Sequence, residues 1–151
     1  MAFTGEIYKH IVILDSNNKP VTRIIGGVTR RITIAGNDKF EVTKTVADNY
    51  DKLTIWNDGD GGLSDFDYLV CENMGAYAIL LELVVDRAGT PKYASFPVAA
   101  YHVFDLTDDD MQTVVLTDGT ITTMDQVDQI NVKRNAADAV GDGEFYLGLF
   151  T

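Results

Sequence analysis

The sequence predicts an all-β protein, folded as an antiparallel β-sandwich or barrel that is jelly-roll-like. Apolar residues alternate with polar ones at a period of two along most of the chain, as in strands with one buried side. Short glycine- and aspartate-rich stretches separate these segments. Of the 23 acidic residues 18 are aspartate, which is preferred in turns and depleted from strands. We also expect a short N-terminal arm and at most one helical turn.

Length and composition predict one domain. The chain has 151 residues, of which 46% are hydrophobic and 23% charged, so a single domain over residues 1–151 can bury an ordinary core. The longest apolar run, Ala76 to Val85, is interrupted by Glu82 and is too short to span a bilayer. The N-terminus lacks the apolar core of a signal peptide. We therefore expect no membrane contact and no export.

Residues 1–8, MAFTGEIY, come before the first clear alternation and are predicted to form the arm. Phe3, Ile7 and Tyr8 are its large apolar residues. Apolar residues on an arm favour a partner surface, and packing of the arm on its own domain is the alternative. Phe3, Ile7 and Tyr8 are therefore candidate interface residues.

The first clear strand spans Val28–Ala35, with Val28, Ile32 and Ile34 on one face. The same alternation follows in residues 40–46 and 53–55. These segments are predicted to be strands with one buried side.

Two long strands, Ala76–Asp86 and Tyr93–Phe104, are predicted in the centre, joined by the turn-forming residues 87–92. The first is apolar on both faces, which indicates protein on both sides. The second contains Pro97, which cannot donate a ladder hydrogen bond and so belongs at an edge or a bulge.

The C-terminal part predicts two more strands, around Ile130–Val132 and Phe145–Leu149. The last strand ends in Phe150, a further candidate interface residue. A single helical turn is expected at Thr123–Gln126, where a Thr and a Gln three positions apart could form a capping box.

Charge is uneven along the chain. Residues 1–57 hold 8 Lys or Arg against 6 acids, whereas residues 58–151 hold 4 against 17. Phosphate binding needs clustered Lys and Arg, so nucleic acid is not an expected direct partner. The first part could face an acidic protein surface, but the simpler interpretation is that the acid keeps the protein soluble.

One acidic stretch, WNDGDGGLSDFD over Trp56–Asp67, is the candidate for a metal site. No register of it satisfies an EF-hand calcium loop, because acids and glycine do not fall at the required positions. An exposed turn is the preferred interpretation, and an irregular calcium cage is the alternative. Trp56 is a candidate interface or core residue, or a stacking platform for a sugar. The cage would be formed by Asp58, Asp60, Asp65 and Asp67.

No catalytic set is predicted. His10 and His102 each lie in an apparent strand without a nucleophile motif nearby. Cys71 is the single cysteine, so it forms no intramolecular disulfide, and its apolar surroundings predict an inert buried thiol. The glycine pairs match no phosphate-binding fingerprint. We therefore expect neither enzyme activity nor a cofactor.

Two segments, VVDRAGTPKYASFPVAAYHVFDL and TDGTITTMDQVDQINVKRNAADAVGDGEFYLGLFT, resemble small β-rich virion proteins of tailed bacteriophages, most of all capsid decoration (cement) proteins. The resemblance implies a non-enzymatic protein on the capsid surface, assembled in the host cytoplasm in many copies, often as trimers. Its implied partners are copies of itself and the major capsid protein, at whose joints it would stabilise the shell. Such proteins act through surfaces, so no single residue role is carried over.

A structural virion protein is thus the leading hypothesis. Tail and head-completion proteins share the same sequence style and are the nearest alternatives. A calcium- or carbohydrate-binding β-sandwich module, using Trp56 and the acidic stretch, is the rival from another class.

Overall fold

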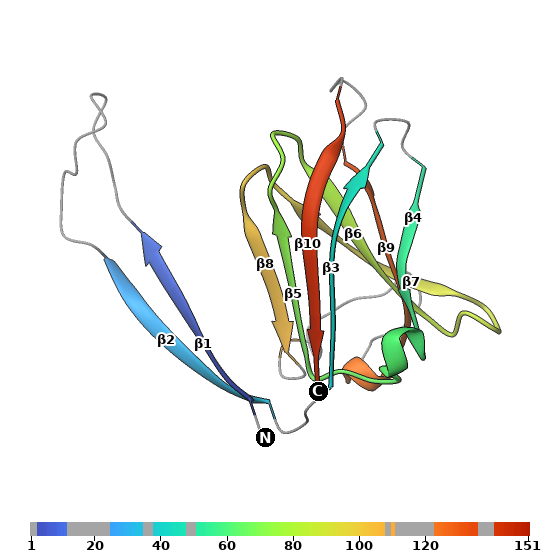
Figure 1. The fold of residues 1–151 in the computed structure, drawn as a ribbon, viewed down its shortest axis with the longest axis horizontal. Helices are drawn as coiled ribbons and strands as arrows, with labels where there is room; N and C mark the ends of the chain where they lie inside the picture. Colours follow the sequence, from blue (N-terminus) through green and yellow to red (C-terminus); the bar gives the residue numbers. More distant parts are fainter. Residues whose placement is uncertain are drawn as a thin grey trace. The chain divides into compact units, whose positions relative to one another are not determined.

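The computed structural model describes residues 3–11, 25–34, 38–47, 51–107, 110, 123–135 and 141–151. The chain divides into two compact units, Met1–Asn37 and Asp38–Thr151, and each is described by itself (Figure 1). No helix in the described ranges is long and apolar enough to cross a membrane.

The first unit contains a two-stranded antiparallel sheet, here called the N-terminal ribbon. It consists of β1 (Phe3–Ile11) and β2 (Ile25–Ile34). The segment predicted as an arm is therefore largely a strand, since Phe3, Ile7 and Tyr8 all lie in β1. An isolated two-stranded sheet is marginally stable in water, so the ribbon needs a further surface to pack on.

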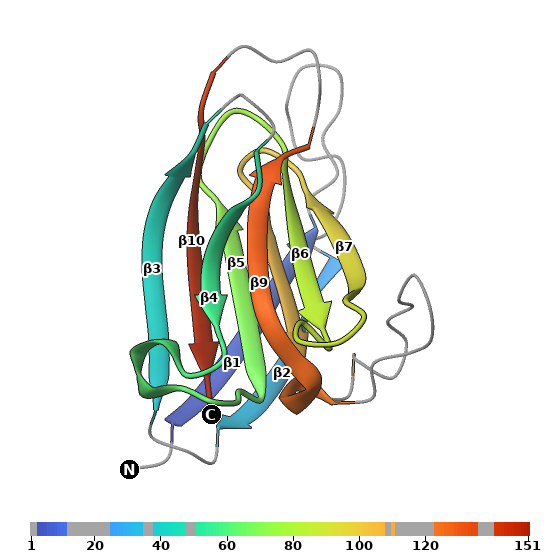
Figure 2. The same cartoon turned by 90° about the vertical axis from the view of Figure 1, so that its right-hand side faces the viewer.

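The second unit is a sandwich of two four-stranded antiparallel sheets, seen from two sides in Figures 1 and 2. The first sheet has the order β3 (Lys39–Val46), β10 (Gly143–Phe150), β5 (Tyr68–Asn73), β8 (Val103–Thr107). The second sheet has the order β4 (Leu53–Asn57), β9 (Val127–Arg134), β6 (Ile79–Val85), β7 (Lys92–Val98).

The pairing of these eight strands is nested. β3 pairs with β10, β4 with β9, β5 with β8, and β6 with β7, all antiparallel. The chain thus folds back on itself about the β6–β7 hairpin, and the β10–β5 and β6–β9 pairings roll this double strand into two sheets. This is the jelly-roll arrangement. The predicted all-β sandwich is confirmed.

The core lies between the two sheets, and all eight strands contribute to it. Strand β6 has Ile79, Leu81 and Leu83 in this core. On its other side, Glu82 and Val84 are also buried. Most of β6 is thus buried on both sides, but in the described residues a second sheet covers only its core side, so the expected protein layer on its other side is not shown. The largest fully buried apolar side chains of the core are Trp56, Phe66, Phe145, Leu63, Leu69, Ile79, Leu81, Leu83 and Met124.

The central hairpin is confirmed, but its second strand is shorter than predicted. The β6–β7 register runs from Ile79 opposite Val98 to Val85 opposite Lys92, and Pro97 lies on the edge strand β7 as expected. The chain then leaves the second sheet at residues 99–102 and enters the first sheet as β8. The prediction of one continuous strand to Phe104 is therefore wrong, because two sheets must share this segment.

Helical structure also differs from the prediction. The expected turn is present as η2 (Met124–Gln126), but the side chain of Thr123 makes no capping hydrogen bond. A second turn, η1 (Asp60–Gly62), lies in the acidic stretch. Its glycines at 59, 61 and 62 all have positive φ, which glycine adopts without steric cost. The limit of one helical turn is thus wrong.

Candidate interaction surface

The acidic stretch folds as a turn held by its own side chains. Asp60 accepts hydrogen bonds through Oδ2 from the backbone nitrogen and the side-chain amide of Asn57, at 2.8 and 3.2 Å. Gly59 donates to the carbonyl of Leu63 at 2.9 Å, and Gly62 donates to that of Gly59 at 3.1 Å. These bonds close a compact turn, as the preferred interpretation expects.

The four carboxylates of the calcium hypothesis are not brought together. In the ranges that the structure describes, which include all four, no three His, Cys, Asp or Glu side chains converge as metal ligands. The minority hypothesis of a cage formed by Asp58, Asp60, Asp65 and Asp67 therefore has no geometric support.

Trp56 lies in the core. Its exposed fraction is 0%, and its ring packs edge to face on Phe66 with 5.3 Å between centroids. The β4–β9 register shifts between Thr54 and Trp56, so Ile55 and Trp56 are both buried although they are adjacent. A bulge of this kind breaks the alternation of strand faces. Trp56 is thus neither a sugar platform nor an interface residue.

The outer face of the second sheet carries a polar network. Glu82 is 6% exposed, and its two carboxylate oxygens accept hydrogen bonds from Lys52 Nζ at 2.8 Å each. Asn131 Nδ2 donates to the same carboxylate at 3.1 Å, and Thr54 Oγ1 donates to Asn131 Oδ1 at 2.9 Å. These groups satisfy one another, so the network stabilises the sheet surface and does not point to a ligand.

Substituting Lys52 tests this network. Lys52→Met is expected to lower the free energy of unfolding by about 1–2 kcal/mol, because it leaves the carboxylate of Glu82 buried without its cation. The loss is smaller than for a fully buried pair, since the lysine side chain is 45% exposed. Urea denaturation measures it. In Lys52→Met/Glu82→Gln most of the loss should be recovered, and a loss as large as in the single variant would contradict the assigned pairing.

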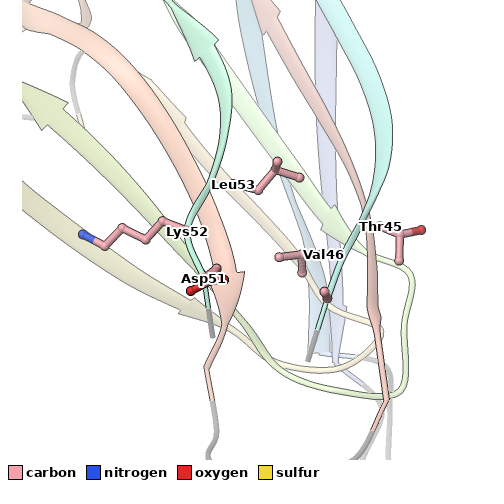
Figure 3. Close-up of a pocket in the computed structure, with 6 residues that line it drawn as sticks. Thr45, Val46, Asp51, Lys52 and Leu53 are labelled. Atoms are coloured by element: carbon pink, nitrogen blue, oxygen red, sulfur yellow. The ribbon is translucent and has the colours of Figure 1, made fainter. Parts of the chain in front are cut away.

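An open pocket of about 230 Å³ lies where β3 ends and β4 begins (Figure 3). It is smaller than typical small-molecule sites. Its two charged residues are Asp51 and Lys52. The ammonium of Lys52 is bound to Glu82 and points away from Val46 and Leu53. The pocket therefore offers no assembled acid–base pair. Its lining residues are Thr45, Val46, Ala47, Asp51, Lys52 and Leu53.

The outer face of the first sheet carries apolar side chains at exposed or half-buried positions. We call Tyr68, Val70, Val103, Tyr146 and Phe150 the aromatic patch. Val103 is 62% exposed, and the other four are half-buried. The rings of Tyr68 and Phe150 are stacked, with their centroids 6.1 Å apart. Apolar side chains gathered on the outer face of a sheet mark a candidate interaction site.

Gly148 allows the patch to form. A Cβ at Gly148 would lie 2.6 Å from the hydroxyl of Tyr146 and 2.8 Å from the ring of Phe150, so both side chains converge over this glycine. Tyr146 donates from its hydroxyl to Glu41 Oε1 at 2.8 Å. Burial, with this hydrogen bond and nearby negative charge, raises the pKa of Tyr146 to about 12. A hydrogen bond from Lys39 is the main cause that lowers the pKa of Glu41.

Comparison with known proteins finds no family and only a distant structural likeness. No family model matches the chain, and no curated protein matches it. A solved structure described as "Bacillus endospore appendages form a novel family of disulfide-linked pili" is similar over 75% of this chain and 85% of that chain. The sequence identity is 13% and the TM-score is 0.36. A likeness this distant carries no argument about function.

Two of the five candidate interface residues, Trp56 and Phe150, lie in the second unit. Of these two, Phe150 is half-buried at the surface and belongs to the aromatic patch. Phe3, Ile7 and Tyr8 lie in the N-terminal ribbon. The patch itself was not predicted. Its signal in the sequence is the alternation of Tyr146, Gly148 and Phe150 on the side of the last strand that faces away from the core.

Three other residues were considered for chemistry: His10 lies in β1, and His102 and Cys71 lie in different environments of the second unit. His102 is exposed in the turn before β8, with Nδ1 at 2.8 Å from the carbonyl oxygen of Ala100. Cys71 is fully buried in the core. Its burial raises the pKa of the thiol to about 12. The thiol is therefore protonated at neutral pH and is poorly nucleophilic.

Cys71 gives a direct test of this burial. The native protein is expected not to react with Ellman's reagent at pH 8, because the thiol is both protonated and inaccessible. In 8 M urea one thiol per chain should react at the rate of a free cysteine, since the unfolded thiol returns to its ordinary pKa. Absorbance at pH 8 with and without urea checks this. Rapid reaction of the native protein would place Cys71 at the surface.

Proposed function

We propose that this protein is a non-enzymatic structural component of a virus particle, of the capsid decoration type, which binds copies of itself and the major capsid protein. It would act on the capsid surface after assembly in the host cytoplasm. The carrying observation is that the chain holds a complete jelly roll and, in its first unit, a sheet of only two strands. The jelly roll buries its own core, whereas a two-stranded ribbon needs a further surface.

Other features support an assembly role. The aromatic patch leaves apolar surface on a sheet that already has its core on the other side. The two features on which a ligand-binding module depended do not favour it, because Trp56 is buried and the four aspartates do not converge. Interfaces of structural subunits depend on buried area spread over many residues rather than on one reactive site.

The test is binding to particles. Purified protein is mixed with capsids that lack it, and co-sedimentation is measured over a range of protein concentrations. Saturable binding in a fixed ratio to the major capsid protein supports the decoration role. Occupancy of a few copies per particle would instead favour a tail or head-completion protein. Protein that stays in the supernatant at every concentration, and that mass spectrometry does not find in purified particles, overturns the proposal.

A further inference from the structure

The aromatic patch has an acidic surround. The register of the first sheet places Val70 beside Gly148 and Asp105, and places Val103 beside Glu72. Glu41 lies opposite Gly148 on the other side of β10. The exposed or half-buried charged residues on this face are therefore mostly acidic. They are Lys39, Glu41, Glu72, Asp105 and Glu144.

The two units of the chain carry opposite net charges. Residues 1–37 hold 5 Lys or Arg against 2 acids, a net charge of +3, whereas residues 38–151 hold 7 against 21, a net charge of −14. Opposite potentials on two surfaces accelerate and orient their association. The first unit of one copy is thus electrostatically suited to the second unit of another copy.

One register face of the N-terminal ribbon combines apolar and basic positions. Strand residues two apart share a face, and directly opposed residues share it as well. The apolar positions on this face are Phe3, Ile7, Val28, Ile32 and Ile34, and the basic ones are Lys9 and Arg30. This composition complements an apolar patch with an acidic surround.

We propose that this face of the ribbon of one copy docks on the aromatic patch of a second copy. The inference rests on the proposed function, because it assigns the surface through which the copies bind one another. The ligand is thus a basic, apolar β-ribbon from an identical chain. Docking covers the apolar positions of the ribbon and supplies a packing surface on which a two-stranded sheet depends for stability.

The expected size of the contact predicts a closed oligomer. A two-stranded ribbon of about nine residues is roughly 30 Å long and 10 Å wide, so one contact buries about 300 Å² on each partner. This is too little for a stable pair. Exchange of two or three ribbons around a symmetry axis multiplies the area and leaves no ribbon unpaired. We therefore expect a closed ring of copies rather than a simple chain.

The experiment uses the full-length protein in sedimentation equilibrium at 50 mM and 500 mM NaCl. The wild type should self-associate, and at least tenfold more weakly at the higher salt concentration, because charge attraction is screened. Val103→Arg should weaken association at least tenfold, since it places a cation in the patch at an exposed position. The matched control is Ser95→Arg, which adds the same charge at an exposed position on β7 of the second sheet and should have no effect.

Cross-linking identifies the occupant. A mixture of ¹⁴N- and ¹⁵N-labelled full-length protein is treated with a carbodiimide, which joins lysine to carboxylate directly. Peptides that join Lys9 to Glu72, Glu41 or Asp105 and that contain both isotopes are the expected result. Such links with a single isotope only would mean that each ribbon packs on its own jelly roll, which overturns the inference.

Two further outcomes separate this inference from the proposed function. A monomer that still saturates capsids overturns the inference alone. Equally, if Val103→Arg abolishes capsid binding but not self-association, the patch is a site for the capsid protein and not for the ribbon. Equal denaturation midpoints of Val103→Arg and Ser95→Arg by circular dichroism show that both variants are folded.

Discussion

Replacing Trp56 with alanine is expected to lower the free energy of unfolding by about 3–5 kcal/mol. The ring has no exposed surface and packs on Phe66, so its removal leaves a cavity between the two sheets. Because this is the single tryptophan, urea denaturation is followed by circular dichroism and not by fluorescence. A loss of this size is a large fraction of the total stability of a domain, so unfolding of Trp56→Ala should begin at low urea concentration.

Two controls make this result specific. Trp56→Phe is expected to cost less, about 1–2 kcal/mol. Within the described structure the indole nitrogen of Trp56 has no hydrogen-bond partner, so phenylalanine loses volume but no hydrogen bond. Val103→Ala, at a 62% exposed position, should change stability by no more than about 0.5 kcal/mol. A loss of less than 1 kcal/mol in Trp56→Ala would contradict its place in the core.

Alternation and turn residues were enough to predict the sandwich and its central hairpin. They failed where the backbone departs from regular alternation. A period of two places Ile55 and Trp56 on opposite faces, but the bulge in β4 brings both into the core. A bulge depends on how two strands pair, so one strand read alone does not reveal it.

The crossing between β7 and β8 shows a second limit. Residues 93–104 contain no glycine, asparagine or aspartate to signal a turn. The structure nevertheless turns there, with Tyr101 at a φ of 60°, a conformation that is uncommon for a tyrosine. Long-range pairing of β8 with β5 outweighs the local preference for a continuous strand.

The candidate surface was only partly predictable, for a related reason. Of the residues in the aromatic patch, the sequence pattern pointed only to Phe150, the apolar residue at the end of the last strand. The patch needs β8, β5 and β10 side by side, which only the jelly-roll pairing brings about. The register places Val103 and Tyr146 on either side of Glu72 on this face, although 43 positions separate them in the sequence. Which residues share this face therefore depends on the strand register, which the sequence pattern does not give.

Replacing Asn73 with alanine is expected to cost about 2–4 kcal/mol, the other large effect. Asn73 is fully buried at the end of β5. Its amide donates to the carbonyl oxygens of Tyr77, Val98 and Ala99 at 2.8, 3.0 and 3.0 Å, and its Oδ1 accepts from the nitrogen of Gly75 at 3.1 Å. Removing one side chain leaves several buried backbone groups without this partner. Urea denaturation at pH 7 measures the loss.

Asn73→Asp should make this cost depend on pH. A carboxylate cannot donate, and it would face three carbonyl oxygens in a buried position, so folding disfavours the charged form and raises the pKa of the new carboxyl group. The unfolded carboxyl keeps a pKa of about 3.9. The variant is therefore closest to the wild type below that pH, where the protonated acid can still donate one hydrogen bond. Its deficit grows as pH rises through the raised folded pKa.

The measurement compares unfolding free energies of Asn73→Asp and wild type at pH 4 and pH 7, so that the titration of other groups cancels. The matched control is Asn135→Asp, which makes the same chemical change at an exposed position. Its difference from wild type should stay nearly constant over this range, because an exposed carboxyl keeps its ordinary pKa. A deficit of Asn73→Asp that is independent of pH would mean that the side chain at position 73 reaches water. In that case Asn73 would not hold the end of β5 to Val98 and Ala99, where β7 ends and the chain crosses to β8. Strand β8 contributes Val103 to the aromatic patch.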